Sequence, residues 1–213
     1  MLKVISLDLD GTLVESTFAD KVWLEGLPKL YSKEKNTSLE ESKNYIFKLY
    51  GMVGKNKKEW YDIDWWFEKF GLKGSWQNLL YRYRNNIKSY PEIVEVLENI
   101  KKKFDLIIIS NAKKEFIDIQ LKETNLKPYF KHVFSSLSDF YMVKKTPIVY
   151  KKVLNLLKIQ SNEIIHIGDN FEFDYISPKK IGINSFYLNR KRTEKGEHII
   201  FSLTELNGIL ENF

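Results

Sequence analysis

Five short runs of apolar residues constrain most strongly how this chain of 213 residues folds. From residue 106 onward, stretches with helical spacing separate the runs from one another. Strands that alternate with helices are typical of a parallel sheet with both faces covered, so the sequence predicts an α/β fold. The expected strands are residues 4–7, 106–109, 133–135, 164–167 and 185–188.

Helical patterns follow two prolines in the predicted sheet region. Pro91 and Pro147 each stand at the first turn of one pattern, where proline is favoured because a helix leaves that N–H unpaired. A short closing helix is expected over residues 203–210. The residues expected to face inward are Ile93, Val96, Leu97 and Ile100 after the first proline, and Tyr150, Val153, Leu154 and Leu157 after the second.

Residues 15–90 show a different pattern, without strand-like runs and rich in aromatic and charged residues at helical spacing. Such density is more typical of the core of a small helical bundle than of a ligand-stacking surface. We therefore expect residues 1–14 and 91–213 to form an α/β core, and residues 15–90 to form an inserted helical cap that closes over it. The cap residues expected to face inward are Leu39, Ile46, Leu49 and Tyr50 in one helix and Trp60, Ile63, Phe67 and Phe70 in another.

Composition narrows the class of protein. With 43% hydrophobic residues the chain can bury a sizeable core, and it has neither an apolar run of membrane-spanning length nor a leader-like start, so we expect a cytoplasmic protein. The absence of cysteine excludes disulfides and thiolate metal sites and leaves oxygen and imidazole ligands. The net charge of +6 comes from lysines spread along the chain, which favours anionic small substrates over nucleic acid.

Two carboxylates follow the first expected strand. Asp8 and Asp10 are two residues apart, so they start on one face of the strand, and Gly11 then lets the backbone turn sharply beside a ligand. Like charges this close are tolerated where a cation neutralises them or a proton is shared. Taken alone, the pattern is as typical of a plain Asp-Gly turn as of a catalytic site.

The ends of the other expected strands favour the catalytic interpretation. In a parallel open sheet, ligands bind beyond the carboxyl ends of the strands. These ends carry a hydroxyl with an amide, a pair of lysines, and further carboxylates: Ser110 with Asn111, Lys144 with Lys145, and Asp169 with Asp174. Carboxylates that hold Mg²⁺, together with cations and hydroxyls that hold phosphate oxygens, indicate phosphoryl transfer.

The same segments resemble the four motifs of the haloacid dehalogenase (HAD) superfamily of hydrolases. In order along the chain, they are Asp-Leu-Asp-Gly-Thr-Leu from Asp8, Ser110-Asn111, Lys144, and Gly168-Asp169 with Asp174. The resemblance covers nearly all of the chain outside the insert and implies a Rossmann-like parallel core. Residues 15–90 stand where the family carries its C1-type helical cap.

The resemblance also implies a phosphatase mechanism. Asp8 is then the nucleophile that accepts the phosphoryl group as an aspartyl phosphate, and Asp10 is the general acid and base. Ser110 and Lys144 are the expected phosphate-binding residues, with support from Asn111.

Magnesium is the cofactor that the resemblance implies. Asp8, the backbone carbonyl of Asp10, and Asp169 are the expected ligands of Mg²⁺. Asp174 is expected to orient these ligands or to act through a water molecule.

Several alternatives to a phosphatase remain open. Dehalogenases of the superfamily lack the second aspartate and need no metal, so Asp10 and Asp169 favour the phosphatase. A phosphomutase keeps the same residues, and a non-catalytic relative keeps the fold. Lys145 is the alternative to Lys144 as the phosphate lysine, because the family usually has Lys-Pro at these two positions.

The expected partner is a small phosphorylated metabolite, with no nucleic acid and no membrane. Because caps diverge, the sequence does not identify the phosphate ester, and the oligomeric state is open. Arg82, Arg84 and the tryptophans of the insert are candidate substrate contacts, and Phe171 and Phe173 are expected to narrow the entrance.

Overall fold

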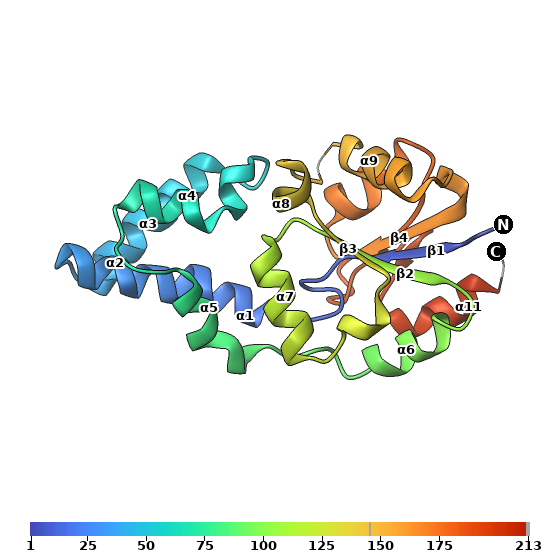
Figure 1. Ribbon diagram of the computed structural model, residues 1–213, viewed down its shortest axis with the longest axis horizontal. Coiled ribbons are helices and arrows are strands. Elements are labelled where there is room, and N and C mark those ends of the chain that lie inside the picture. The colour runs from blue at the N-terminus through green and yellow to red at the C-terminus, as the bar shows by residue number, and fades with distance from the viewer. Residues whose placement is uncertain (145, 212–213) are drawn as a thin grey trace.

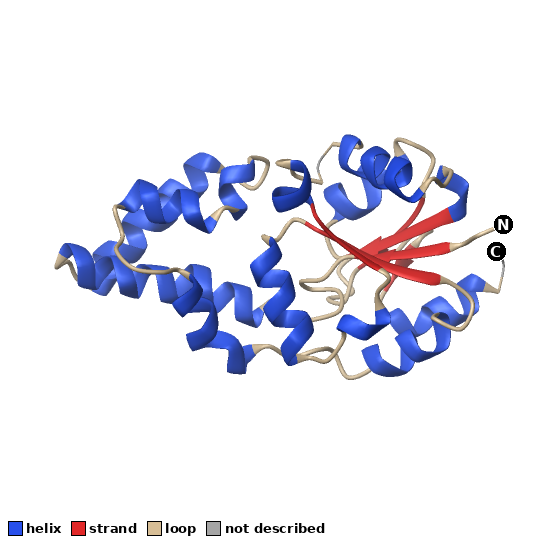
Figure 2. Ribbon diagram, viewed as in Figure 1, coloured by secondary structure: helices blue, strands red, loops and turns tan. Residues whose placement is uncertain are grey.

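The computed structural model describes residues 1–144 and 146–211, and within them a six-stranded sheet has the order β3-β2-β1-β4-β5-β6. Every neighbouring pair is parallel, which confirms the α/β class (Figure 2). The strands are β1 (Val4–Leu7), β2 (Asp105–Ser110), β3 (His132–Ser135), β4 (Ile164–Gly168), β5 (Asn184–Leu188) and β6 (Ile199–Ile200).

The five expected strands are all present, with bounds that differ by no more than one residue at either end. The short strand β6 was not predicted, because two residues carry no periodic signal. It pairs with β5 at the edge of the sheet, directly after the basic loop over residues 189–196. The expected closing helix begins as a 3₁₀ turn (Leu203–Glu205) and continues as α11 (Leu206–Leu210).

Helices cover both faces of the sheet (Figure 1). On one face, Ile5 and Leu7 pack with residues of α6 (Ile93–Ile100), α7 (Lys114–Glu123) and α11. On the other face, Val4 packs with residues of α9 (Ile148–Leu157). Alternate side chains of β1 therefore point to opposite covered faces, which explains why its apolar run is continuous.

The insert between β1 and β2 is helical, as expected. Phe18, Ile46 and Trp66 form its buried core, and Phe116 of α7 joins that core from the α/β part. Leu39 is 37% exposed, so its predicted inward position is wrong; it is the first residue of its helix and lies outside the packed cluster. The helices are α1 (Thr17–Asp20), α2 (Leu27–Lys35), α3 (Leu39–Val53), α4 (Ile63–Phe70) and α5 (Gln77–Tyr83).

Two connections join the insert to the sheet and run side by side. Val14 forms an antiparallel bridge with Ser89, and the Tyr90 N–H donates to the Leu13 carbonyl at 3.2 Å. Because this pairing directly follows the end of β1, the insert extends from the carboxyl edge of the sheet (Figure 1).

No helix within the described part of the chain combines the length and the apolar character needed to cross a bilayer. The cytoplasmic location stays a prediction.

Candidate active site

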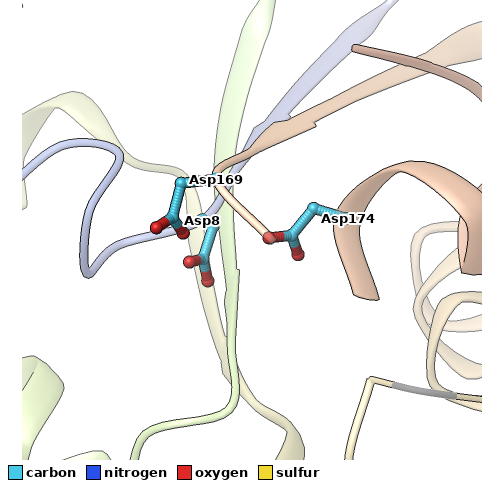
Figure 3. Close-up of side chains that lie close together, drawn as sticks. All are labelled: Asp8, Asp169 and Asp174. Atoms are coloured by element: carbon cyan, nitrogen blue, oxygen red, sulfur yellow. The ribbon is translucent and has the colours of Figure 1, made fainter. Parts of the chain in front are cut away.

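Three carboxylates meet at the carboxyl ends of β1 and β4 (Figure 3). Asp8 directly follows β1, Asp169 directly follows β4, and Asp174 lies in the π-helical segment Phe171–Ile176. Each offers an oxygen, and these oxygens lie within 4.8 Å of one another. The structure thus brings together three aspartates that the sequence singled out after two different strands.

Lys144 provides the positive charge in this group. Its ammonium donates to Asp8 Oδ1 at 2.5 Å, to Asp174 Oδ1 at 2.7 Å and to the Ile109 carbonyl at 3.0 Å. The side chain is 2% exposed, and its backbone N–H donates to Asn111 Oδ1 at 2.8 Å. Lys145, the alternative phosphate lysine, lies outside the described residues.

Polar groups at the end of β2 line the same cavity. The Ser110 hydroxyl accepts from the Ala112 N–H at 3.1 Å, and Ser136 Oγ donates to the Ser110 carbonyl at 2.9 Å. The side-chain oxygen of Asn111 accepts the hydrogen bond from the Lys144 backbone N–H, so the Asn111 side chain anchors the loop after β3 to the end of β2. The two predicted phosphate-binding residues of this strand therefore lie beside the carboxylates.

Two glycines allow the carboxylates to approach the backbone. A Cβ on Gly11 would collide with the Asp169 carboxylate, and Gly11 also has a φ of +76°, which side chains rarely adopt. A Cβ on Gly168 would collide with the Asp174 side chain. Both positions therefore require glycine if the carboxylates are to stay where they are.

The turn after Asp10 is held in place by Arg190, which follows the carboxyl end of β5. Arg190 donates to the Gly11 carbonyl at 3.2 Å and to the Thr12 carbonyl at 2.7 Å, and it forms an ion pair with Glu92 at 2.6 Å. Its guanidinium lies 3.5 Å from the centroid of the Tyr90 ring. Arg190 therefore positions the loop that follows the Asp-x-Asp pair, a role that the sequence did not reveal.

The carboxylates of the site have perturbed acidities. Burial raises the pKa of Asp8 well above its usual range, although Lys144 opposes the rise. Burial also raises the pKa of Asp10 to about 6, while the amide of Gln120 lies close enough to oppose this. Neither the side-chain oxygen nor the side-chain nitrogen of Gln120 makes a hydrogen bond of good geometry within the described residues.

Asp169 and Asp174 respond in opposite ways. Asp169 is exposed to the cavity, yet the protein around it and the nearby Asp174 raise its pKa to about 7. Burial alone would raise the pKa of Asp174, but the charge of Lys144 and hydrogen bonds from His166 and Lys144 lower it to about 2. Asp174 is thus the anion that balances Lys144.

His166 supports Asp174 from inside β4. It is fully buried, its Nδ1 lies 2.8 Å from Ser6 Oγ, and its Nε2 lies 3.2 Å from Asp174 Oδ1. Burial lowers the pKa of His166, although Asp174 opposes the change. His166 is the polar residue within the apolar run of residues 164–167, and this was the sequence signal available for its role.

The donor set suits a hard divalent cation. Carboxylate oxygens such as those of Asp8, Asp169 and Asp174 are the ligands that Mg²⁺ prefers. Burial is the main reason why the pKa values of Asp8 and Asp169 are raised, and the charge of the nearby Asp174 adds to the rise. A divalent cation at this position would offset the repulsion among the carboxylates.

A cavity of about 450 Å³ opens above these residues between the sheet and the insert. The insert supplies Tyr61, and burial raises the pKa of its phenol. Lys113, at the start of α7, forms ion pairs with Asp62 at 3.3 Å and with Asp64, both on the insert. These contacts hold the insert against the core at the edge of the cavity.

The candidate substrate contacts named from the sequence divide into two groups. Trp23 and Trp60 line the cavity, as does Phe173. The other candidates do not belong to its lining within the described residues: Trp65, Trp66, Trp76, Arg82, Arg84 and Phe171. Arg84 instead stacks on a neighbouring tyrosine of α5. Sequence reasoning missed Tyr61 and Lys113, because nothing in their local pattern distinguishes them from surface residues.

Comparison with known proteins identifies the family. A family model described as haloacid dehalogenase-like hydrolase matches residues 5–188. The chain therefore belongs to the haloacid dehalogenase-like hydrolases, as the four motifs indicated.

Individual relatives are distant. A glyceraldehyde 3-phosphate phosphatase from Pyrococcus abyssi is 24% identical over 197 residues, which cover 88% of this chain and 81% of that protein. The haloacid dehalogenase-like hydrolase domain-containing protein 3 of Danio rerio is 28% identical over 111 residues. That match covers 49% of this chain and 45% of the fish protein, so the matched part is less than half of its length.

A solved phosphatase structure and a solved dehalogenase structure both share this fold. A HAD phosphatase from Thermococcus onnurineus has a TM-score of 0.87 at 24% identity, with 98% of each chain covered. A 2-haloacid dehalogenase from Pseudomonas syringae pv. Tomato DC3000 has a TM-score of 0.72 at 19% identity, with 100% of this chain and 99% of that chain covered. These likenesses establish the fold and leave the reaction to the residues of the site.

Proposed function

We propose that this hydrolase is a Mg²⁺-dependent phosphatase that cleaves a small phosphate monoester through an aspartyl phosphate on Asp8. One observation carries the proposal: the Asp8 carboxylate lies 2.5 Å from the Lys144 ammonium at the floor of a cavity that Asp10 also lines. Nucleophile, cation and proton donor are thus together where a phosphate ester can enter. The phosphatase from Pyrococcus abyssi supports the same reaction class.

The roles follow from the chemistry of each group. Asp8 attacks phosphorus and forms the acyl phosphate, while Lys144 and the Ser110 hydroxyl neutralise and orient the phosphate oxygens. Asp10 protonates the leaving alcohol and then deprotonates the water that hydrolyses the intermediate. A pKa of about 6 for Asp10 supports both roles, because the group can then carry or accept a proton near neutral pH.

Asp8 and Asp169 would hold Mg²⁺ together with the backbone carbonyl of Asp10, and the ion would supply positive charge near the phosphate. Asp174 would orient these ligands through Lys144 and the loop after β4. The division into a core of residues 1–14 and 91–213 and a cap of residues 15–90 is part of the proposal, with the cap excluding water during the reaction.

The two aspartates of the pair give the decisive experiment. Asp8→Asn should abolish phosphoryl transfer, since an amide is a poor nucleophile. Asp10→Asn should still release p-nitrophenol, which needs little protonation, but should lose roughly 10²- to 10⁴-fold in hydrolysis of the intermediate. Phosphate should therefore accumulate on the peptide that contains Asp8, where mass spectrometry of a quenched reaction detects it.

Three controls separate this proposal from its rivals. Turnover that persists in EDTA would contradict the metal requirement. Release of chloride from 2-chloropropionate would indicate a dehalogenase instead. A stable phosphoenzyme in the wild type that passes its phosphate to a second sugar phosphate would indicate a phosphomutase.

A further inference from the structure

Four aromatic side chains that contact one another line one part of the cavity. Trp23 stacks on Phe116, with ring centroids 5.8 Å apart and planes 9° from parallel. Tyr50 lies edge-on to Trp23 at 6.2 Å and packs against Trp60 at 5.8 Å. All four residues line the cavity, and we call them the aromatic wall. Three come from the insert and Phe116 comes from α7, so the wall spans both parts of the protein.

The cations of the cavity are already paired. Lys144 is bound to two aspartates of the floor, and Lys113 is paired with Asp62 and Asp64 of the insert. Among the residues that the structure describes, no other lysine or arginine lines the cavity. A second anionic group on the substrate, such as a carboxylate or another phosphate, would therefore find no free cation among these described lining residues.

Further negative charge lies on the insert side of the cavity. Asp20 belongs to the lining, and its carboxylate accepts a hydrogen bond from Ser16 Oγ at 2.9 Å. This carboxylate can accept from a hydroxyl or amide of a neutral ligand, and it repels an anionic one. The electrostatics of the cavity thus favour a substrate whose only anionic group is the phosphate that is cleaved.

From the aromatic wall and the paired cations, we propose that the substrate is a phosphate monoester of an uncharged alcohol that carries a flat aromatic ring. The inference rests on the phosphatase function proposed above. With the phosphate at the carboxylate floor, the ring stacks on the aromatic wall, where planar rings gain specific attraction beyond the burial of their surface. The volume of about 450 Å³ lies at the lower end of the roughly 300 to 1,000 Å³ typical of small-molecule sites.

Nucleosides and simple aryl alcohols share this chemistry, so two matched pairs of esters distinguish them. The first pair is inosine 5′-monophosphate and ribose 5-phosphate, which differ by the base. The second pair is 2-phenylethyl phosphate and ethyl phosphate, which differ by the phenyl ring. We expect kcat/KM to be about tenfold higher for the ring-bearing ester of at least one pair, and phosphoglycolate to be a poor substrate.

Variants of the wall test whether the ring contacts it. Trp60→Leu should lower kcat/KM for the preferred ring-bearing ester about 3- to 10-fold more than for its ring-free partner. Tyr81→Leu is the matched control, because Tyr81 is an aromatic residue of the same insert that is 63% exposed and lies outside the cavity lining. It should leave the ratio within each pair unchanged. Because the wild-type comparison needs no variant, the proposal stays testable even where Trp60→Leu does not fold.

The possible failures are distinguishable. Equal kcat/KM within both pairs, or a preference for phosphoglycolate or phosphocholine, would overturn the aromatic leaving group while leaving the phosphatase intact. Absence of hydrolysis of every ester, including p-nitrophenyl phosphate with Mg²⁺, would overturn the phosphatase itself and the inference with it.

Discussion

Replacement of Asp174 by asparagine tests the buried network of the site directly. Asp174 is fully buried and accepts from the Lys144 ammonium at 2.7 Å, from the Asn170 N–H at 3.0 Å, and faces His166 at 3.2 Å. Asparagine keeps the size of the side chain but removes the charge. Lys144 then retains Asp8 as its one carboxylate partner within the described residues.

The magnitude follows from the acidity of the group. A pKa lowered from 3.8 to about 2 corresponds to about 2 to 3 kcal/mol of stability at neutral pH. Removal of one member of a buried ion pair typically costs about 3 to 5 kcal/mol of stability. Because Lys144 keeps its ion pair with Asp8, we expect the cost of Asp174→Asn to lie at the lower end of this range. We therefore expect a loss of about 3 kcal/mol, or roughly 6 to 12 °C in Tm for a chain of this size.

The pH dependence has a definite sign. Because the pKa of Asp174 is lowered by folding, its contribution to stability is fully present above the unfolded value of 3.8 and is lost as the pH falls through about 2. Urea unfolding followed by tryptophan fluorescence should therefore show a smaller difference between wild type and variant at the lowest accessible pH than at pH 5.

Asp105→Asn is the control, since Asp105 pairs with Lys131 at 2.7 Å on the surface and both side chains are more than half exposed. It should cost less than about 1 kcal/mol. A loss of under about 1 kcal/mol for Asp174→Asn, with an unchanged m-value, would refute the reasoning.

Three further predictions concern the cavity and its walls. Protons compete with a metal at carboxylates whose pKa values are raised, as that of Asp169 is to about 7, so Mg²⁺ should raise Tm more at pH 8 than at pH 5. Equal Tm shifts at the two pH values would contradict a metal site at Asp169. Lys113→Met removes the ion pairs between α7 and the insert, so trypsin should cleave the connection near Ser89 faster, while the free energy of unfolding falls by less than about 1 kcal/mol. An unchanged rate of cleavage would show that these ion pairs do not hold the insert. Gly11→Ala should destabilise the protein by about 1 to 2 kcal/mol and displace Asp169. Gly51→Ala is the control, because Gly51 lies in an open position of α3, and it should stabilise the protein by up to about 1 kcal/mol. Equal effects of the two variants in urea unfolding would contradict the close approach of Asp169 to Gly11.

The α/β core could be predicted from the sequence because its signals are local. Strands buried on both faces read as apolar runs, and parallel strands align their carboxyl ends at one edge, so the ends of β1, β2 and β4 were expected at the same edge of the sheet. That rule places Asp8 and Asp169 at one edge, whereas their expected roles came from the family resemblance. The edge strand β6 did not, because a two-residue strand forms where its neighbour offers hydrogen bonds rather than where its own sequence dictates.

The sequence named the tryptophans of the insert only as candidates, and which residues form the roof of the cavity could not be predicted, because the roof depends on long-range packing. Tyr61 and Trp60 stand in a 3₁₀ turn (Lys58–Tyr61), and only the position of the insert over the sheet brings them to the cavity. Lys113 has the local sequence of an ordinary helix start, and its aspartate partners lie about 50 residues away in the chain. Contacts of this kind depend on how two hydrophobic cores meet, which no local period encodes.

The hydrogen bonds of Lys144 define what a ligand must do in this cavity. An ammonium has three donors, and here they go to Asp8, Asp174 and the Ile109 carbonyl. Under the proposed function, a phosphate oxygen therefore reaches Lys144 only by replacing one of these bonds. Both aspartates line the cavity, but Asp174 and Ile109 are fully buried whereas Asp8 keeps 7% exposure, so the bond to Asp8 is the one that a ligand reaches most readily. The same exchange frees the Asp8 carboxylate from its ion pair at the moment when a phosphate is beside it, which couples substrate binding to release of the nucleophile.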